Sequence, residues 1–503
     1  MKSQREKRAK FNIIFSLLGQ VITLICGLII PRLLIIEFGS EAYGATASIA
    51  QFLAYISLLE GGIGGVARAA LYKPLSERDN KSISIVVYEI KHFFRIVGFV
   101  FCIYVVVLAL SFGSLSHIEC FDKVTTFLLV VVISISTFAQ YFVGISYSVL
   151  LQAAQKTYIT QIASSITIVL NAILIILLVM LNSNIIVVKL ISSLVFVIKP
   201  FILWMYVKKE FDLVEVTKRK PELLEQKWTG LGQHIAFFLH SNTDIAVLTI
   251  LTNLKYVAVY SVYNMIISQI QNFTTSFSTG MEALFGDMLA QKEIVELHDT
   301  FDLYEGIISF VAGVFFSVTA VMIIPFVRIY TYGLNDANYI YPFFGFVLVI
   351  ASYVFCLRMP YHSMTIAAGC FKETKFAAYG EALINISLSI ILVSKFGLIG
   401  VAIGTFVAVV FRTFYYVYYL SHNVFNRKIR KFFKRTLTNI VSFGIVMLIG
   451  NVVLKNIDIR NYVQWAVAAC IVSMVSLVIQ LIIMKLFYKE LQHKIFRFLF
   501  RVR

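Results

Sequence analysis

The feature that most constrains this chain is its succession of long apolar runs. Two examples are VISISTFAQYFVGISYSVLL (132–151) and IVSMVSLVIQLIIMKLF (471–487), each close to the roughly 20 residues that a helix needs to cross a bilayer. A backbone inside hydrocarbon must satisfy its own hydrogen bonds, which only helices and closed barrels achieve. Barrel strands are about 10 residues of alternating polarity, so these runs predict an all-α protein that crosses a membrane many times.

Apolar stretches of this length recur along the whole chain, and composition agrees with them. Of 503 residues, 59% are hydrophobic and 14% are charged, against about 25% charged in soluble proteins. The first stretch is too long for a removable signal peptide and lacks a small-residue cleavage site, so we expect it to be retained. We predict about 14 transmembrane helices, centred near residues 22, 56, 101, 136, 170, 196, 240, 268, 315, 352, 385, 409, 446 and 475.

The 44 Lys and Arg residues predict the orientation, because cytoplasmic loops beside transmembrane helices are enriched in them. With the N-terminus inside, internal segments hold about 30 of them and external loops about 7. An even number of helices then places both termini in the cytoplasm. The net charge of +17 is explained by topology and by anionic lipid headgroups, so membrane lipids are expected partners and nucleic acid is not.

No metal site is expected either. The six cysteines lack the paired spacing of metal ligands, and the eight histidines form no ligand pair.

A repeat is visible in the sequence. A shift of 214 residues places Asn171 on Asn385 and the segment 33–48 on 247–262. The shift maps the first six helices onto the next six with the same topology, which predicts two pseudo-symmetric six-helix lobes. Parallel repeats of this kind often enclose a substrate site at their interface. The predicted domains are an N-terminal lobe (1–209), a cytoplasmic linker (210–228), a C-terminal lobe (229–425) and a basic loop with helices 13 and 14 (426–503).

Polar residues within apolar stretches are costly unless they face protein or water. Around residue 268 they recur every three or four positions, which places them on one face of a helix. That face is a packing seam of hydrogen bonds or the wall of a water-filled cavity, and its Asn, Gln and Glu side chains favour the cavity. The residues of this face are Asn264, Ser268, Gln271, Thr275, Ser278 and Glu282.

Under the repeat, Arg68 corresponds to Glu282. The two could pair as an inner gate, or Arg68 could serve an anionic ligand while Glu282 serves a proton or cation. They could also be separate side chains that extend to the membrane surface.

Further ionisable or amide groups are predicted within the spans. For each of them a structural ion pair and a ligand contact remain open alternatives. These groups are Lys199, Gln233, His240, Asp244, Arg358, Glu381, Asn385 and Arg412.

Three segments carry a family resemblance: LLEGGIGGVARAALYKPLSERD (58–79), the stretch 257–291 and the stretch 358–416. Across nearly its whole length the chain resembles the polysaccharide transporter branch of the multidrug/oligosaccharidyl-lipid/polysaccharide (MOP) superfamily, which includes Wzx-type flippases. The resemblance implies a MATE-like fold and a bacterial cytoplasmic membrane location. It also implies flipping of undecaprenyl-pyrophosphate-linked oligosaccharide units of O-antigen, capsule or exopolysaccharide by alternating access, with a polysaccharide polymerase and other assembly proteins as partners.

The chemistry of such a substrate suggests roles for the polar residues. Arginine offers planar, permanently charged donors to a pyrophosphate, and sugars need a wet, hydrogen-bonding wall. We predict no cofactor and no catalytic residue, but coupling to protons or Na⁺ through Asp244, Glu282 and Glu381. The predicted substrate-binding residues are Arg68, Arg358, Arg412, Asn264, Ser268, Gln271, Thr275 and Asn385.

The sequence is also compatible with three alternative functions to different degrees. A lipid II flippase shares the pyrophosphate carrier and differs only in the head group. A multidrug or cation antiporter would need acidic cavities, whereas this chain carries at least as many predicted buried cations as carboxylates. A membrane glycan polymerase or ligase would need a large external loop with an acid/base constellation, and predicted external loops such as RIYTYGLNDANYI (328–340) are short. The chain is therefore not expected to be an enzyme.

Overall fold

The computed structural model describes residues 2–60, 63–216, 219–228, 231–278, 280–455 and 457–488, and these ranges contain helices and no strand. Eleven helices in the described ranges are long and apolar enough to cross a membrane. The predicted all-α, multi-pass membrane fold is therefore confirmed.

The count of eleven differs from about 14 for identifiable reasons. Two predicted spans, near residues 22 and 56, lie in one continuous helical stretch, Ile14–Glu60. Near residue 240 the described residues contain a shorter apolar helix, Asn242–Leu251. The helix at residue 268, α9 (Leu254–Ser276), is not among the eleven, and it is the helix with the predicted polar face.

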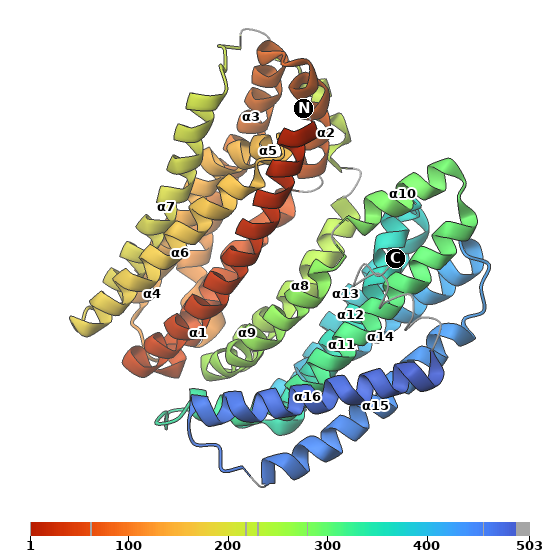
Figure 1. Cartoon of the computed structure of the whole chain (residues 1–503). Helices are drawn as coiled ribbons and strands as arrows, with labels where there is room; N and C mark the ends of the chain where they lie inside the picture. The colour runs from red at the N-terminus through yellow and green to blue at the C-terminus, as the bar shows by residue number, and fades with distance from the viewer. Residues whose placement is uncertain are drawn as a thin grey trace. The chain divides into compact units, whose positions relative to one another are not determined.

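Contacts divide the chain into two compact units. Unit 1 comprises residues 1–238 and 253–258. Its core joins α2, α3, α5 and α7 through buried side chains such as Leu71, Phe94, Leu150 and Leu203. The elements, coloured red to yellow-green in Figure 1, are α1 (Lys2–Ala54), η1 (Tyr55–Glu60), α2 (Ile63–Glu77), α3 (Asn80–Ser116), α4 (Lys123–Ala139), η2 (Gln140–Gly144), α5 (Ile145–Ala153), α6 (Thr157–Met180), α7 (Ile185–Glu210) and η3 (Pro221–Trp228).

Unit 2 comprises residues 239–252 and 259–503, and α8 (Leu231–Leu251) contributes to both units. Gly400 lets α13 and α14 approach closely, since a Cβ there would lie 2.4 Å from the Leu392 backbone. The remaining elements of unit 2, beside α9, are α10 (Met281–Gln291), α11 (Ile294–Tyr330), α12 (Pro342–Ala367), α13 (Phe371–Phe396), α14 (Leu398–Asn423), α15 (Arg430–Lys455) and α16 (Tyr462–Phe487).

The helix boundaries confirm the internal repeat. A shift of 214 residues carries both ends of α3 (Asn80–Ser116) onto both ends of α11 (Ile294–Tyr330), and the start of α6 onto the start of α13. Left-handed backbone recurs as well, at Arg78 (φ 56°) and Lys292 (φ 60°). The contact-based division falls within α8, so the predicted domain boundaries at 209, 228 and 425 stay a prediction.

The connecting segment after α7 is attached to unit 1. Arg219 donates to Glu89 of α3 at 3.0 Å, and the backbone N–H of Lys220 donates to the same carboxylate at 2.9 Å. The backbone N–H of Val214 donates to the Ser84 hydroxyl at 3.0 Å. This part of the predicted linker is thus held by α3 through specific contacts.

Candidate functional site

Three of the predicted site residues form a closed ion triad in unit 2. Arg358 of α12 and Arg412 of α14 each place Nη1 2.6 Å from a different oxygen of the Glu381 carboxylate on α13. The three side chains are 3%, 2% and 0% exposed. One carboxylate therefore joins three helices that are separate in sequence.

The surroundings of the triad explain how it is tolerated. The guanidinium of Arg358 lies 4.8 Å from the centre of the Phe355 ring, and that of Arg412 lies 5.0 Å from the Tyr416 ring. Aromatic faces attract cations, most strongly where water is excluded. Of the two alternatives left open by the sequence, the structure shows the ion pair, and a substrate-binding role of Arg358 and Arg412 stays a prediction.

A second buried network surrounds Asp244 of α8, which is 4% exposed. Its carboxylate accepts hydrogen bonds from Tyr260 at 2.8 Å, from Thr405 at 2.8 Å and from Asn385 Nδ2 at 3.4 Å. Within the described part of the chain, Asp244 forms no ion pair. A buried carboxylate held by neutral donors alone retains an uncompensated charge when it is ionised.

Further oxygen atoms lie close to Asp244. The Thr405 hydroxyl lies 3.3 Å from Asn385 Oδ1 and 3.2 Å from the Val401 carbonyl, and the Ser389 hydroxyl donates to Asn385 Oδ1 at 3.1 Å. Carboxylate, amide, hydroxyl and carbonyl oxygens are the ligands that hard cations prefer. A proton on the carboxylate would remove the charge equally well.

The Asp244 network contains residues that the sequence did not single out. Asp244 and Asn385 were predicted separately, whereas Tyr260 and Thr405 were not predicted. Tyr260 and Thr405 are residue types that are common within helices. Nothing in the neighbouring sequence distinguishes them from residues that serve only in packing. Only the approach of α8, α9, α13 and α14 brings them together.

The prediction that six polar residues lie on one face of a single helix is wrong. Helix α9 ends at Ser276, Gly280 adopts φ 89°, and Glu282 lies on the separate helix α10, where it is exposed. Left-handed backbone is accessible to glycine at little cost and interrupts a helix. Ser278, which is buried, falls in the interruption.

The other four residues of the face remain together on α9. All four are partly buried, and they are Asn264, Ser268, Gln271 and Thr275. The hydroxyls of Ser268 and Thr275 donate to carbonyls of their own helix, at 3.3 Å and 3.1 Å. A water-facing role for this group stays a prediction.

Arg68 lines a cavity inside unit 1. The cavity has a volume of about 270 Å³, and Arg68 of α2 donates there to Gln152 Oε1 of α5 at 2.9 Å. An adjoining cavity of about 420 Å³ shares Glu60 and Gln140 with it and extends to Lys199. The three alternatives that the sequence leaves for Arg68 and Glu282 stay open.

The sequence analysis missed Glu60, which lines both cavities and accepts a hydrogen bond from the Tyr141 hydroxyl at 2.5 Å. Beside it, residues Gln140–Gly144 form one turn of π-helix, a distortion that is frequent at functional sites. A signal for Glu60 was present, because a carboxylate within an apolar stretch is expected to be functional.

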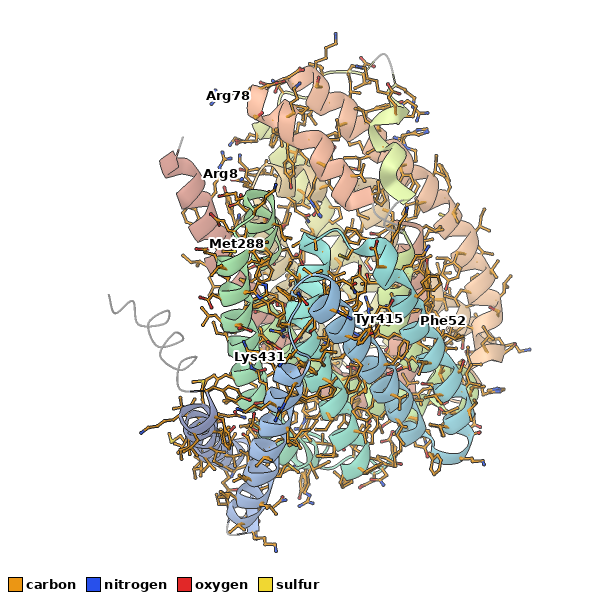
Figure 2. The ribbon with its side chains drawn as sticks, turned by 90° about the vertical axis from the view of Figure 1, so that its right-hand side faces the viewer. Arg8, Phe52, Arg78, Met288, Tyr415 and Lys431 are labelled. Carbon is orange, nitrogen blue, oxygen red and sulfur yellow. The ribbon has the colours of Figure 1, made fainter. Side chains whose placement is uncertain are left out.

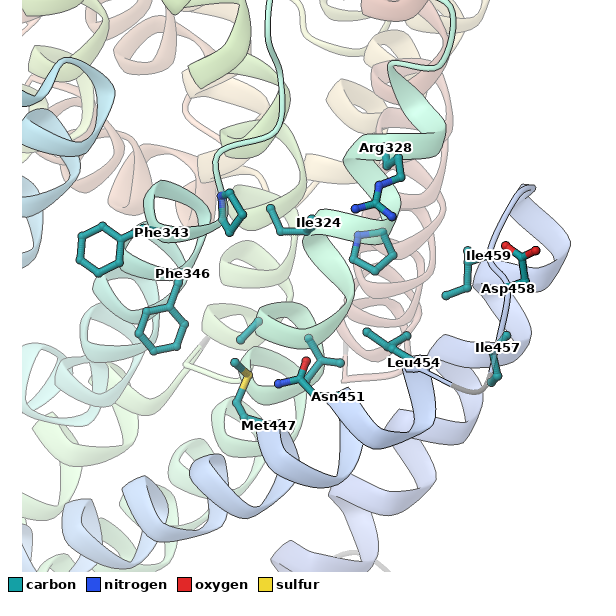
Figure 3. A pocket seen from close by; sticks show the side chains of 14 residues that line it. Ile324, Arg328, Phe343, Phe346, Met447, Asn451, Leu454, Ile457, Asp458 and Ile459 are labelled. Atoms are coloured by element: carbon teal, nitrogen blue, oxygen red, sulfur yellow. The ribbon is translucent and has the colours of Figure 1, made fainter.

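A larger pocket of about 660 Å³ lies among α11, α12 and α15 of unit 2. Phe343 and Phe346 form an apolar wall, while Arg328 and Asn451 contribute polar groups, as Figure 3 shows. Apolar walls with a cation at one side suit an amphiphile better than a sugar.

Comparison with known proteins identifies solved structures that share this architecture. No family model matches the sequence, and no curated protein matches it. Among solved structures, the lipid II flippase MurJ in an inward closed conformation matches with a TM-score of 0.72 and 17% identity, over 95% of this chain and 99% of that chain. An inward-facing MATE multidrug transporter of the MOP superfamily matches with a TM-score of 0.60 and 15% identity, over 80% of this chain and 95% of that chain.

The chain has the fold of these transporters. A third structure, the MATE multidrug transporter DinF-BH, matches with a TM-score of 0.58 and 16% identity, over 84% of this chain and 96% of that chain. At these identities the likeness shows the fold and leaves the substrate undetermined. The resemblance to the MOP superfamily is supported at the level of fold, while the polysaccharide branch stays a prediction.

Proposed function

We propose that this chain is a membrane transporter that flips a lipid-linked oligosaccharide pyrophosphate from the inner to the outer leaflet by alternating access. The observation that carries the proposal is the match to a lipid flippase over 95% of the chain, compared with 80% and 84% for the two multidrug transporters. Both kinds of protein share one fold, but the more complete match is to the protein whose cargo is a lipid.

The polar groups described above suit the parts of such a substrate. Arg68 and Lys199 lie in the unit 1 cavities with uncharged donors such as Gln140 and Gln152, and cations with amides suit phosphates and sugar hydroxyls. An inside-negative potential would favour outward movement of the pyrophosphate by about 2.3 kcal/mol per charge per 100 mV. The pocket beside Arg328 would accommodate an apolar chain.

The Asp244 network supports a proposal about energy coupling. In the proposed cycle, Asp244 takes up a proton or Na⁺, with oxygens of Asn385 and Thr405 completing the shell. Neutralising a buried carboxylate stabilises one packing of α8 against α13 and α14, so ion occupancy biases the conformational equilibrium. Glu381 is already paired with two arginines, which makes it the weaker coupling candidate.

Coupling is tested with purified protein by measuring the unfolding midpoint against Na⁺ concentration, with choline as the replacement cation, and against pH. We expect wild-type protein to be stabilised by Na⁺ or by protonation, because either removes the buried charge. Asp244→Asn should lose that response. Thr413→Val should retain it, because the hydroxyl of this buried threonine donates to the Val409 carbonyl of its own helix α14. A response that survives in Asp244→Asn would exclude Asp244 as the coupling site.

The substrate is tested in proteoliposomes that contain either an undecaprenyl-pyrophosphate oligosaccharide or lipid II, with flipping read from access to an external enzyme. We expect faster flipping of the oligosaccharide. Preference for lipid II would favour the alternative flippase. Movement of cationic drugs without movement of either lipid would overturn the proposal in favour of an extruder, and release of polymerised glycan would favour an enzyme.

The remaining proposals concern place and partners. We propose that the protein resides in the bacterial cytoplasmic membrane with both termini in the cytoplasm, and that it works beside a polysaccharide polymerase and other assembly proteins. Single cysteines at exposed Lys73 and at exposed Tyr332 should be modified by impermeant reagents from the inside and the outside, respectively. The reverse pattern would overturn the orientation.

A further inference from the structure

A charged cluster joins α11 to the start of α15. Glu305 of α11, which is 3% exposed, lies 3.0 Å from Arg427 and 2.7 Å from Arg435. Asp302, one turn earlier on α11, pairs with Arg427 at 2.9 Å and with Lys431. Lys431 is labelled near the start of α15 in Figure 2. Two carboxylates in this cluster thus serve three cations.

The guanidinium groups of the cluster stay charged. Burial opposes the charge of Arg427, but Glu305, Tyr361 and Asp302 together outweigh it and raise the pKa of Arg427 above its ordinary value. Arginine is not deprotonated in proteins. The five groups together carry one positive charge in excess. Lys431 is 49% exposed and therefore shares its charge with water, whereas the guanidinium of Arg435 is buried.

Beside Arg435 lies a cavity of about 30 Å³, lined by α11, α15 and α16. Two donors of its lining, Arg435 Nε and Gln480 Nε2, are buried and have no hydrogen-bond partner among the described residues. The two side chains are 5% and 3% exposed. Leaving a buried donor unsatisfied costs about 1–3 kcal/mol, and more for a charged group.

The close approach of α11 and α16 is built into the sequence. A Cβ at Gly313 of α11 would lie 2.5 Å from Gln480 Nε2, so a larger residue there would require the amide to move. Asn439 of α15 and Gly306 of α11 line the same cavity. The cavity therefore has amide and guanidinium groups from α15 and α16 and a glycine from α11.

We propose that this cavity binds one small inorganic anion of halide size, with Arg435 and Gln480 as its donors. A volume of about 30 Å³ has room for a body of roughly water size, which is too small for a phosphate or a lipid headgroup. A cation would be repelled by the guanidinium of Arg435. A water molecule could bond the donors but would offer the guanidinium no opposite charge. The bound anion would tie α15 and α16 to α11, independently of the transported substrate.

The test uses the full chain in detergent and measures its thermal unfolding midpoint at constant ionic strength while sodium gluconate is replaced by sodium chloride or bromide. A ligand that binds only the folded state raises the midpoint in a saturable way. We expect such a rise with both halides and none with phosphate. Equal midpoints in chloride and gluconate would overturn the proposal.

Two variants make the test specific. Gln480→Met removes a donor and fills the cavity, so the halide response should be lost. Ser476→Ala is the matched control, because Ser476 is buried one turn earlier on α16 and bonds Ser317 at 2.9 Å; it should keep the response. A response retained in Gln480→Met would count against the site.

A direct measurement covers the case in which Gln480→Met does not fold. Crystals of the wild-type protein grown in bromide should show an anomalous peak beside Arg435 and Gln480. Density of a water molecule without an anomalous signal would overturn the proposal, whatever the stability data show.

Discussion

Units 1 and 2 are related by the internal repeat, but equivalent positions form buried ion pairs in unit 2 and line a cavity in unit 1. A shift of 214 residues places Thr167 on Glu381 and Gly144 on Arg358, and Lys199 falls one residue beyond the equivalent of Arg412. In unit 2 these positions form the buried ion triad. In unit 1, Thr167 and Lys199 line the cavity of about 420 Å³.

The difference shows that related helices can bury charge or enclose space at the same depth. In unit 2, the long side chains of the triad fill the interior and connect α12, α13 and α14. In unit 1, Thr167 lines a cavity at the matching position, while Gly144 packs against Pro200 of α7. At these equivalent positions, unit 2 therefore places paired charges where unit 1 encloses a cavity.

The strongest test of this comparison removes the shared carboxylate of the triad. Glu381→Gln leaves two arginines buried without a counter-charge, and breaking a buried ion pair costs about 3–5 kcal/mol. We expect a loss of that size in the free energy of unfolding, measured by denaturant titration in detergent. The triple variant Arg358→Met, Glu381→Leu, Arg412→Met should recover most of it, because apolar groups of similar volume can replace a buried ion network.

The close packing of unit 2 is the next point to test. Gly400→Ala would place a methyl group 2.4 Å from the Leu392 backbone, and overpacking of this kind costs about 1–3 kcal/mol. The repeat-equivalent residue in unit 1 is Ile186, so Ile186→Val should cost about 0.5–1.5 kcal/mol. Equal unfolding midpoints for Gly400→Ala and wild type would show that α13 and α14 can separate without cost.

The unit 1 cavity is tested through Arg68. Arg68→Gln removes a guanidinium from the cavity, and a tenfold loss of flipping corresponds to about 1.4 kcal/mol. We expect a decrease of at least this order in proteoliposomes, with the unfolding midpoint unchanged. Lys73→Gln, at an exposed position on the same helix, is the matched control. Wild-type flipping by Arg68→Gln would remove this residue from the proposed substrate site.

The smallest expected effect belongs to Thr167→Val. The Thr167 hydroxyl donates to carbonyls of its own helix, so the helix loses little when it is replaced, and we expect a change in unfolding free energy below about 1 kcal/mol. The contrast with Glu381→Gln measures how differently the two equivalent positions contribute. A loss of unfolding free energy comparable to that of Glu381→Gln would show that the two equivalent positions do not differ in their contribution.

The fold could be predicted because its signals are local or periodic. Apolar stretches of bilayer length predict helices wherever they occur, and one constant shift relates Asn80–Ser116 to Ile294–Tyr330. The candidate site could be predicted only in part. A carboxylate within an apolar stretch, such as Asp244 or Glu381, can be recognised from the sequence because it is unfavourable in hydrocarbon. The residues that pair with it cannot be recognised in this way. The failure at Glu282 has a local cause, since Gly280 was treated as part of a continuous helix.

The sequence by itself determined that this chain is helical, crosses a membrane repeatedly and contains an internal repeat, because the spacing of apolar residues follows directly from bilayer thickness and helix geometry. Tertiary structure alone decided that Arg358 and Arg412 share Glu381, that Tyr260 and Thr405 hold Asp244, and that Glu60 lines a cavity. These pairings join helices that are far apart in sequence. Their geometry depends on how whole helices pack, and no single stretch of sequence encodes that.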